Sequence, residues 1–170
     1  STLIIEKICW NYIDVLISVS SSIINWYLVE FGYKKNLLIL NTPIFKKKSL
    51  RINDNNDLRR IFDINTESLI FIYVGDFCNG RGIDYILDVF SDKNINSNIV
   101  FLGDGLLKNK IYNFSEKFEN IHLHPLVSHD EVVGLIKSSD IGICFIENAS
   151  LSDYYCLPNK LFEYVFAGLE

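Results

Sequence analysis

Short apolar runs alternate with amphipathic stretches along the chain, and this alternation constrains the fold more than any other feature. The run Leu69–Val74 is apolar throughout, which is typical of a parallel strand buried on both faces. Further strands are predicted at 15–19, 37–40, 99–102, 121–123 and 141–146, and helices at 21–31, 83–90, 106–118, 130–137 and 160–166. Strands that alternate with helices of this length form βαβ units. The sequence therefore predicts an α/β fold, with a Rossmann-like parallel sheet covered by helices on both faces.

Charge and composition exclude several classes of protein. The 170 residues carry 16 basic and 21 acidic side chains, for a net charge of -5, which disfavours nucleic acid as a partner because phosphate neutralisation needs a basic surface. The longest uncharged stretch, Val15–Val29, is too short and too polar to span a bilayer. The four cysteines form no C-x-x-C pair and are typical of reduced thiols in a cytoplasmic protein. We therefore expect a soluble globular chain located in the cytoplasm.

Ligands of such sheets bind beyond the carboxyl ends of the strands, and the first predicted loop there is rich in glycine. Gly75 follows the strand directly, and Gly80-Arg81-Gly82 stands just before a helix. Free backbone amides at a helix start, together with a fixed cation, make a phosphate site. The alternative is a flexible loop in which Arg81 points into solvent.

The next strand ends at Gly103-Asp104-Gly105, which begins like a dinucleotide-binding fingerprint. The third glycine of that pattern would fall at position 108, which is Lys108, so a conventional NAD site is disfavoured. Gly103 either lets a bound group approach the backbone or supplies a tight turn.

Two histidines, His122 and His124, share one face of the next predicted strand. A metal pair would need further Cys, Asp or Glu ligands at matching spacing, and the nearby sequence has none. We therefore predict no metal site and place His124 in the lining of a ligand pocket.

The last strand leads into a polar segment, 147–157, that is predicted to be a loop and is followed by a helix. Pro158 at the helix start leaves the amides behind it free to face an anion, and Lys160 adds a positive charge. Glu163 lies one turn further among apolar neighbours. Its carboxylate either accepts hydrogen bonds from a ligand diol, such as a ribose, or lies exposed on the helix surface.

The segment Pro158–Gly168 reads P-N-K-L-F-E-Y-V-F-A-G and resembles a signature of the group 1 retaining glycosyltransferases. These enzymes have the GT-B fold and use nucleotide sugars in bacterial surface polysaccharide assembly, and the signature lies in their donor-binding half. Weaker similarities follow in the family's order at 14–20, 73–75, 80–82, 102–105, 120–127 and 138–143. The resemblance covers nearly all of residues 12–168.

The resemblance implies a nucleoside diphosphate sugar as the donor substrate, with no cofactor and no metal. Arg81 and the amides around Pro158 and Asn159, helped by Lys160, would hold the diphosphate, and Glu163 would bind the ribose. The implied donor site comprises Gly75, Arg81, Gly82, Gly103, His124, Pro158, Asn159, Lys160 and Glu163.

The sequence departs from the family's pattern at two positions. The first glutamate of the family's Glu-x7-Glu pair, which contacts the donor sugar, would fall at Tyr155, so the catalytic residue stays open between Glu147, Asp153 and Tyr155. A second arginine that binds phosphate would fall at Asp76.

By the same resemblance, residues 1–45 would end an acceptor-side domain, and residues 46–170 would form a donor-binding domain that is incomplete at its C-terminus. Both ends look cut, so we expect a fragment that binds nucleotide without turnover. The full-length protein would be a hexosyltransferase that acts with retention on a glycan or lipid-linked acceptor, bound through the missing domain, in the cytoplasm or peripherally at the inner face of the membrane.

Three other functions are weighed against this one. A non-catalytic module that binds sugar nucleotides is supported by Tyr155 and Asp76. A flavodoxin-like signalling receiver needs clustered acids at strand ends, for which Asp76 and Asp104 are the candidates. A sugar epimerase of conventional Rossmann type is disfavoured by the interrupted glycine pattern.

Overall fold

A computed structural model describes residues 2–42 and 57–169. The segment 45–56, which its polar and charged composition predicts to be a surface linker, lies outside these ranges. The chain forms two compact units. Unit 1 comprises Ser1–Thr42 and Asn148–Pro158, and unit 2 comprises Pro43–Glu147 and Asn159–Glu170. The sequence contains no signal that Asn148–Pro158 would group with the N-terminal residues.

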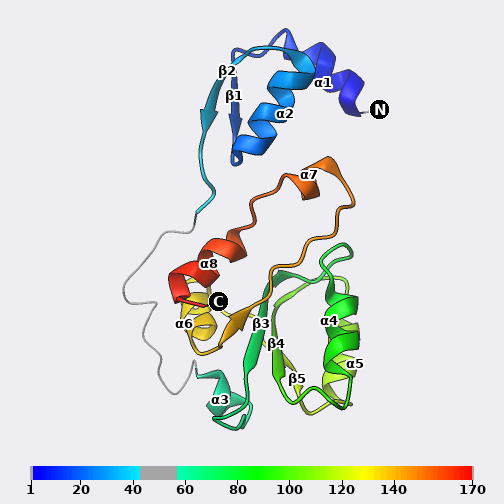
Figure 1. The fold of residues 1–170 in the computed structure, drawn as a ribbon, viewed down its shortest axis with the longest axis vertical. Coiled ribbons are helices and arrows are strands. Elements are labelled where there is room, and N and C mark those ends of the chain that lie inside the picture. Colours follow the sequence, from blue (N-terminus) through cyan, green and yellow to red (C-terminus); the bar gives the residue numbers. More distant parts are fainter. Residues whose placement is uncertain (1, 43–56, 170) are drawn as a thin grey trace. The chain divides into compact units, whose positions relative to one another are not determined.

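Unit 2 is an α/β sandwich built on one parallel sheet. Its strands are β3 (Ile70–Asp76), β4 (Asn98–Asp104), β5 (Ile121–His124) and β6 (Ile141–Gly142), in the order β5-β4-β3-β6. Its helices are α3 (Leu58–Ile61), α4 (Ile83–Phe90), α5 (Lys108–Ser115), α6 (His129–Lys137) and α8 (Asn159–Ala167). Helices α4 and α5 cover one face of the sheet, and α6 and α8 cover the other (Figure 1). The predicted α/β fold is confirmed.

The apolar run of β3 contributes side chains to two separate cores, because successive side chains of a strand point to opposite faces. Ile70 and Ile72 are fully buried in the core on the α6 side, where Leu135 lies. Tyr73 is fully buried in the core on the α4 side, together with Leu87. This is why the run contains no polar residue: both faces of the strand are covered.

The last strand is shorter than the predicted range 141–146, which is wrong beyond Gly142. Tyr164 of α8 inserts where β6 would continue beside β3: its hydroxyl accepts a hydrogen bond from the Val74 N–H at 3.1 Å and lies 3.0 Å from the Ile143 carbonyl oxygen, to which it donates. A Cβ added at Gly142 would lie 2.5 Å from the Tyr164 ring. The tyrosine thus replaces the missing ladder hydrogen bonds and fixes α8 to the ends of both strands.

Tyr164→Phe is expected to destabilise the protein by about 1–3 kcal/mol, because it leaves the buried Val74 N–H without an acceptor. Urea unfolding followed by circular dichroism measures this loss. Tyr112→Phe, which removes the hydroxyl of a tyrosine that is 52% exposed on α5, is the matched control and should change the free energy of unfolding little. Equal effects of the two variants would contradict the role given to Tyr164.

Unit 1 contains a pair of parallel strands and three helices. Its elements are α1 (Thr2–Trp10), β1 (Val15–Ser18), α2 (Ser21–Phe31), β2 (Lys35–Leu38) and α7 (Leu151–Tyr154). Helix α7 lies within the segment 147–157, so the prediction of a continuous loop there is wrong. Ser150 starts this short helix, because its hydroxyl accepts a hydrogen bond from the Asp153 N–H at 3.1 Å.

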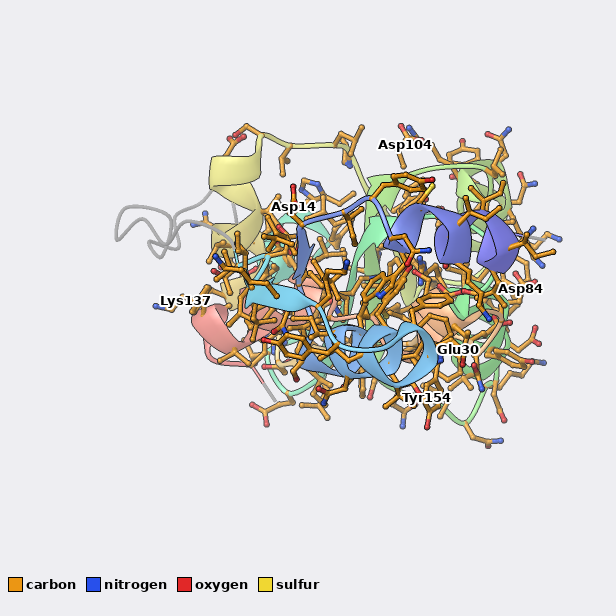
Figure 2. The ribbon with its side chains drawn as sticks, turned by 90° about the horizontal axis from the view of Figure 1, so that it is seen from above. Asp14, Glu30, Asp84, Asp104, Lys137 and Tyr154 are labelled. Atoms are coloured by element: carbon orange, nitrogen blue, oxygen red, sulfur yellow. The ribbon has the colours of Figure 1, made fainter. Side chains whose placement is uncertain are left out.

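Within the described residues, no helix is long and apolar enough to cross a membrane. The side chains of Asp84, Asp104 and Lys137 are exposed on unit 2 (Figure 2). Asp84 pairs with Lys110 at 3.1 Å, and Asp104 pairs with Lys108 at 2.8 Å. Water screens such exposed pairs, so the two buried cores rather than these pairs hold unit 2 together.

Candidate functional site

The carboxyl ends of β3 and β4 lie side by side in unit 2. Gly75 is in register with Gly103, and Asp76 with Asp104. The two following loops are joined where the Phe77 N–H donates to the Asp104 carbonyl oxygen at 2.8 Å. The glycines predicted to border a ligand therefore meet at one edge of the sheet.

Gly103 is required by the packing of the chain itself. A Cβ at this position would lie 1.9 Å from the Gly75 carbonyl oxygen and 3.1 Å from the Phe77 ring. The sequence suggested two roles for Gly103, the close approach of a bound group and a tight turn. The requirement for glycine that the structure shows is a different one. The close approach is between β4 and the backbone of Gly75, near the end of β3.

Lys160 projects from the first turn of α8 to the same edge. Its Nζ atom is buried and lies 3.7 Å from the centroid of the Tyr73 ring. A Cβ at Gly75 would lie 3.4 Å from this atom, so the ammonium sits directly over the glycine that ends β3. Among the described residues, this nitrogen has no hydrogen-bond partner.

The burial of this ammonium has a clear electrostatic consequence. The pKa of Lys160 falls from 10.5 to about 8, mainly because the group is buried and in part because of the nearby Arg81 charge, while Cys144, Glu163 and Cys78 act in the opposite direction. A buried ammonium that lacks a hydrogen-bond acceptor is unfavourable, because it has lost water without a replacement. An anion beside Lys160 would supply that acceptor.

Arg81 is half-buried in the loop between β3 and α4. Burial and a hydrogen bond with Asp76 raise the pKa of the Cys78 thiol, and Arg81 opposes this through its charge and a hydrogen bond to the same thiol. Arg81 is therefore packed into the loop instead of pointing freely into solvent. Two cations predicted from the sequence, Arg81 and Lys160, are brought to one edge of the sheet, where they repel each other.

The start of α4 provides the backbone amides. Gly82 caps this helix in the left-handed conformation, with φ at 68°, and a Cβ there would lie 2.3 Å from the Phe145 ring. The Gly82 N–H donates to Glu147 Oε1 at 3.3 Å, and the Glu147 N–H donates to the Gly80 carbonyl oxygen at 2.9 Å. The carboxylate of Glu147 thus already lies at the helix start that was predicted to face a phosphate.

Glu163 is buried, with 7% of its surface exposed, so it is not a surface residue of α8. It lies one turn after Lys160, and its charge raises the pKa of that ammonium.

The two histidines are held in place by neighbours of the sheet. His122 Nε2 donates to Asn98 Oδ1 at 2.9 Å, its ring stacks on Phe62 at 4.6 Å, and burial lowers its pKa to about 4. His124 is buried, and its Nδ1 donates to the Pro125 carbonyl oxygen at 2.7 Å. No group of three or more metal-ligating side chains occurs in the described ranges.

An apolar cavity of about 250 Å³ lies at the same edge of the sheet, next to Gly75. Its lining consists of Val74, Gly75, Asp76, Leu102, Gly103, Asp104, Leu126, Val127 and Val132. His124, which was expected to line a ligand pocket, is not among these residues. Neither Lys160 nor Arg81 lines this cavity. It meets the Lys160 ammonium at Gly75, and Asp76 and Asp104 are part of its lining.

The three candidates for the catalytic residue fall in different units. Glu147 belongs to unit 2, whereas Asp153 and Tyr155 belong to unit 1, as does Pro158. Asp153 Oδ2 accepts a hydrogen bond from the Ser150 hydroxyl at 2.7 Å, so it takes part in the cap of α7.

Sequence reasoning missed Tyr73 and Tyr164, which support Lys160 and α8. Tyr73 lies in an apolar run, so the sequence predicts only that it is buried in the core. Its contact with Lys160 joins residues 87 positions apart, and no local pattern reports such a pairing.

Comparison with known proteins shows similarity in fold. No family model matches the sequence, and no curated protein matches it. The solved structure of WaaG, a glycosyltransferase involved in lipopolysaccharide biosynthesis, superposes with a TM-score of 0.63 at 16% identity, over 91% of this chain and 42% of WaaG. The E. coli trehalose-6-phosphate structure bound with UDP-2-fluoro glucose superposes with a TM-score of 0.64 at 9% identity, over 91% of this chain and 43% of the other.

A third match is the pneumococcal O-GlcNAc transferase GtfA in complex with UDP and GlcNAc, with a TM-score of 0.57 at 14% identity, over 96% of this chain and 30% of GtfA. These matches confirm the predicted resemblance in fold to glycosyltransferases, of which unit 2 reproduces a Rossmann-like half. The chain spans less than half the length of each of these three structures.

Proposed function

We propose that unit 2 binds the diphosphate of a nucleotide sugar at the carboxyl edge of its sheet. The observation that carries this proposal is the buried ammonium of Lys160, which lacks a hydrogen-bond partner among the described residues and lies over Gly75. Arg81 adds a second positive charge nearby. A diphosphate would supply both charge and acceptors, and Glu163 would accept hydrogen bonds from the ribose.

The proposal extends to glycosyl transfer by the whole protein. Departure of a nucleoside diphosphate from a sugar leaves negative charge on the phosphate oxygens, and fixed cations lower the barrier by stabilising it. Lys160, Arg81 and the amides that follow Pro158 would do so here. The fold is similar to that of proteins solved with UDP or a UDP sugar, which supports a donor of this class.

Several features of the whole protein are part of the same proposal. The whole protein would transfer a hexosyl group with retention to a glycan or lipid-linked acceptor, in bacterial polysaccharide assembly. It would act in the cytoplasm or at the inner face of the membrane. Residues 1–45 would belong to an acceptor-side domain, and residues 46–170 would form the donor-binding domain. A non-catalytic module that binds sugar nucleotides is the second candidate, because Asp76 and Tyr155 stand where the resemblance expects an arginine and a glutamate.

Calorimetric titration of the chain with UDP, GDP, ADP and CDP tests the donor site. We expect one nucleotide to bind selectively and Arg81→Ala to weaken it. No heat of binding with any of the four would contradict the proposal. Sugar transfer by the full-length protein would exclude the non-catalytic alternative.

The affinity for the nucleotide that binds best is expected to fall as the pH rises through about 8. Burial lowers the pKa of Lys160 to about 8 in the free protein, and a bound diphosphate would raise it again. Below pH 7 the ammonium is charged before binding, whereas above pH 8 it must take up a proton, so the affinity drops by up to about tenfold per pH unit.

Titrations at several pH values, in buffers with different heats of ionisation, measure both the slope and the proton uptake. Arg81→Ala should bind more weakly and keep a pH-dependent affinity, with the fall shifted to higher pH, because loss of the Arg81 charge raises the pKa of Lys160. A flat profile between pH 7 and pH 9 would show that Lys160 does not face the ligand.

A further inference from the structure

Unit 1 contains its own cavity, formed by α1, α2 and the segment around α7. Its volume is about 360 Å³, at the lower end of the roughly 300–1,000 Å³ of small-molecule sites. All of its lining residues belong to unit 1. It is therefore separate from the edge of the sheet in unit 2.

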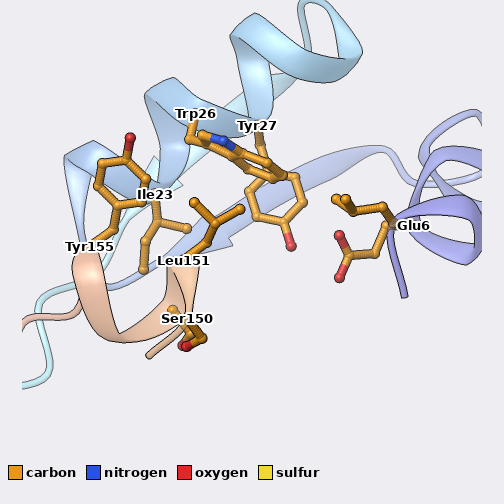
Figure 3. A pocket seen from close by; sticks show the side chains of 9 residues that line it. Glu6, Ile23, Trp26, Tyr27, Ser150, Leu151 and Tyr155 are labelled. Atoms are coloured by element: carbon orange, nitrogen blue, oxygen red, sulfur yellow. The ribbon is translucent and has the colours of Figure 1, made fainter. Parts of the chain in front are cut away.

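One wall of the cavity is aromatic. Trp26 and Tyr155 line it from α2 and from the end of α7 (Figure 3). The Trp26 ring meets the Tyr27 ring edge-on, with centroids 5.0 Å apart, and this contact holds the indole in one orientation. Ile23 and Leu151 complete the apolar part of the lining.

The opposite end of the cavity is polar. The Glu6 carboxylate and the Tyr27 hydroxyl face each other there (Figure 3). Burial, followed by the charge of Glu6 and a hydrogen bond with it, raises the pKa of Tyr27. An ionised carboxylate offers about four acceptor positions, so Glu6 can accept further hydrogen bonds from a ligand beside the one from Tyr27.

We propose that this cavity binds one neutral pyranose unit of a glycan. A pyranose ring presents C–H groups on its faces and hydroxyl groups on its edge, which matches apolar and aromatic walls with a carboxylate at one end. An organic cation would also suit Glu6 and the aromatic rings. A quaternary ammonium, which has no N–H to donate, would however lose its water against Ile23 and Leu151 without gaining hydrogen bonds, so the aliphatic wall favours the sugar.

The proposal assigns a role to Tyr155, which has none in the proposed donor site. The resemblance expects a glutamate at this position, whereas in the structure the tyrosine ring lines the cavity of unit 1. An aromatic ring can stack on a sugar face, which a carboxylate cannot. This site goes beyond the proposed donor site and requires no bound nucleotide.

The test uses tryptophan fluorescence of the whole chain with Trp10→Phe, so that Trp26 is the remaining tryptophan. The probes are the methyl glycosides of glucose, galactose and N-acetylglucosamine, titrated to tens of millimolar. We expect a saturable change with at least one of them. Glu6→Gln should weaken that response about tenfold or more, since a hydrogen bond to a charged group is lost, and Tyr155→Ala should weaken it as well.

Matched controls separate this site from its surroundings. Glu30→Gln and Tyr33→Ala change exposed residues of unit 1 that do not line the cavity, and they should leave the response unchanged. Lys160→Met should also leave it unchanged, because it alters unit 2; loss of the response in that variant would assign the sugar to the donor site and overturn the proposal.

Two further results would overturn the proposal. One is the absence of a saturable response to all three glycosides. The other is a salt-sensitive response to tetramethylammonium in place of the sugars, which would identify an aromatic cage for cations.

Discussion

Lys160→Met is expected to weaken nucleotide binding strongly and, at the same time, to stabilise the free protein. Loss of one partner of a buried charge pair costs at least about 2 kcal/mol, so the affinity for the nucleotide should fall about 30-fold or more. The free protein should gain stability because it no longer buries an ammonium that lacks an acceptor. Lys160 would thus destabilise the free protein, and this cost would be offset only when an anion is bound beside its ammonium.

The gain in stability has a defined pH dependence. The pKa of Lys160 is 10.5 in the unfolded chain and about 8 in the fold, so keeping the ammonium charged in the fold costs on the order of 2–3 kcal/mol at pH 7. This cost is fully present below pH 8. It fades between pH 8 and 10.5, where the fold has released the proton that the unfolded chain still holds. The Tyr73 ring at 3.7 Å offsets part of it by a cation–π interaction.

Urea unfolding at pH 7 and pH 9.5, combined with calorimetric titration, measures both effects. The stabilisation should be larger at pH 7. Lys137→Met, which removes an exposed lysine of α6, is the matched control and should change neither quantity much. Unchanged nucleotide affinity in Lys160→Met would exclude Lys160 from the site, and a destabilised variant would show that its ammonium is well compensated in the free protein.

The order of elements in unit 2 could be predicted because each depends on a local pattern. Leu69–Val74 is apolar without interruption, and the strand lies at Ile70–Asp76. The helix predicted at 83–90 has these same bounds. Errors arose where a distant residue decides the outcome: β6 stops at Gly142 because Tyr164 of α8 inserts beside it, 22 positions later in the chain.

The residues of the candidate site could be predicted in type but not in arrangement. The sequence identified Arg81, Lys160 and Glu163 as polar groups near a helix start. It could not tell that the Lys160 ammonium lies on a tyrosine ring from β3, or that Glu163 is buried. Such facts depend on how α8 packs on the sheet, and that packing is set by long-range contacts.

Gly103→Ala is expected to cause the largest loss of stability among single substitutions at the edge of the sheet. The new Cβ would lie 1.9 Å from the Gly75 carbonyl oxygen and 2.9 Å from its carbonyl carbon. Both atoms belong to the backbone of β3, where Gly75 is in register with Gly103, so they cannot move aside without separating β3 from β4. Overpacking of this kind costs about 3 kcal/mol or more.

Gly80→Ala is the matched control, because it separates a steric clash from backbone strain. Gly80 has a φ of 81°, which disfavours any side chain, but a Cβ there would meet no atom within 4 Å. Left-handed geometry alone costs about 1–2 kcal/mol. Urea unfolding of both variants should therefore show a clearly larger loss for Gly103→Ala. Equal losses would mean that the edge of the sheet yields to the new methyl group, and that Gly75 and Gly103 are not held in close contact.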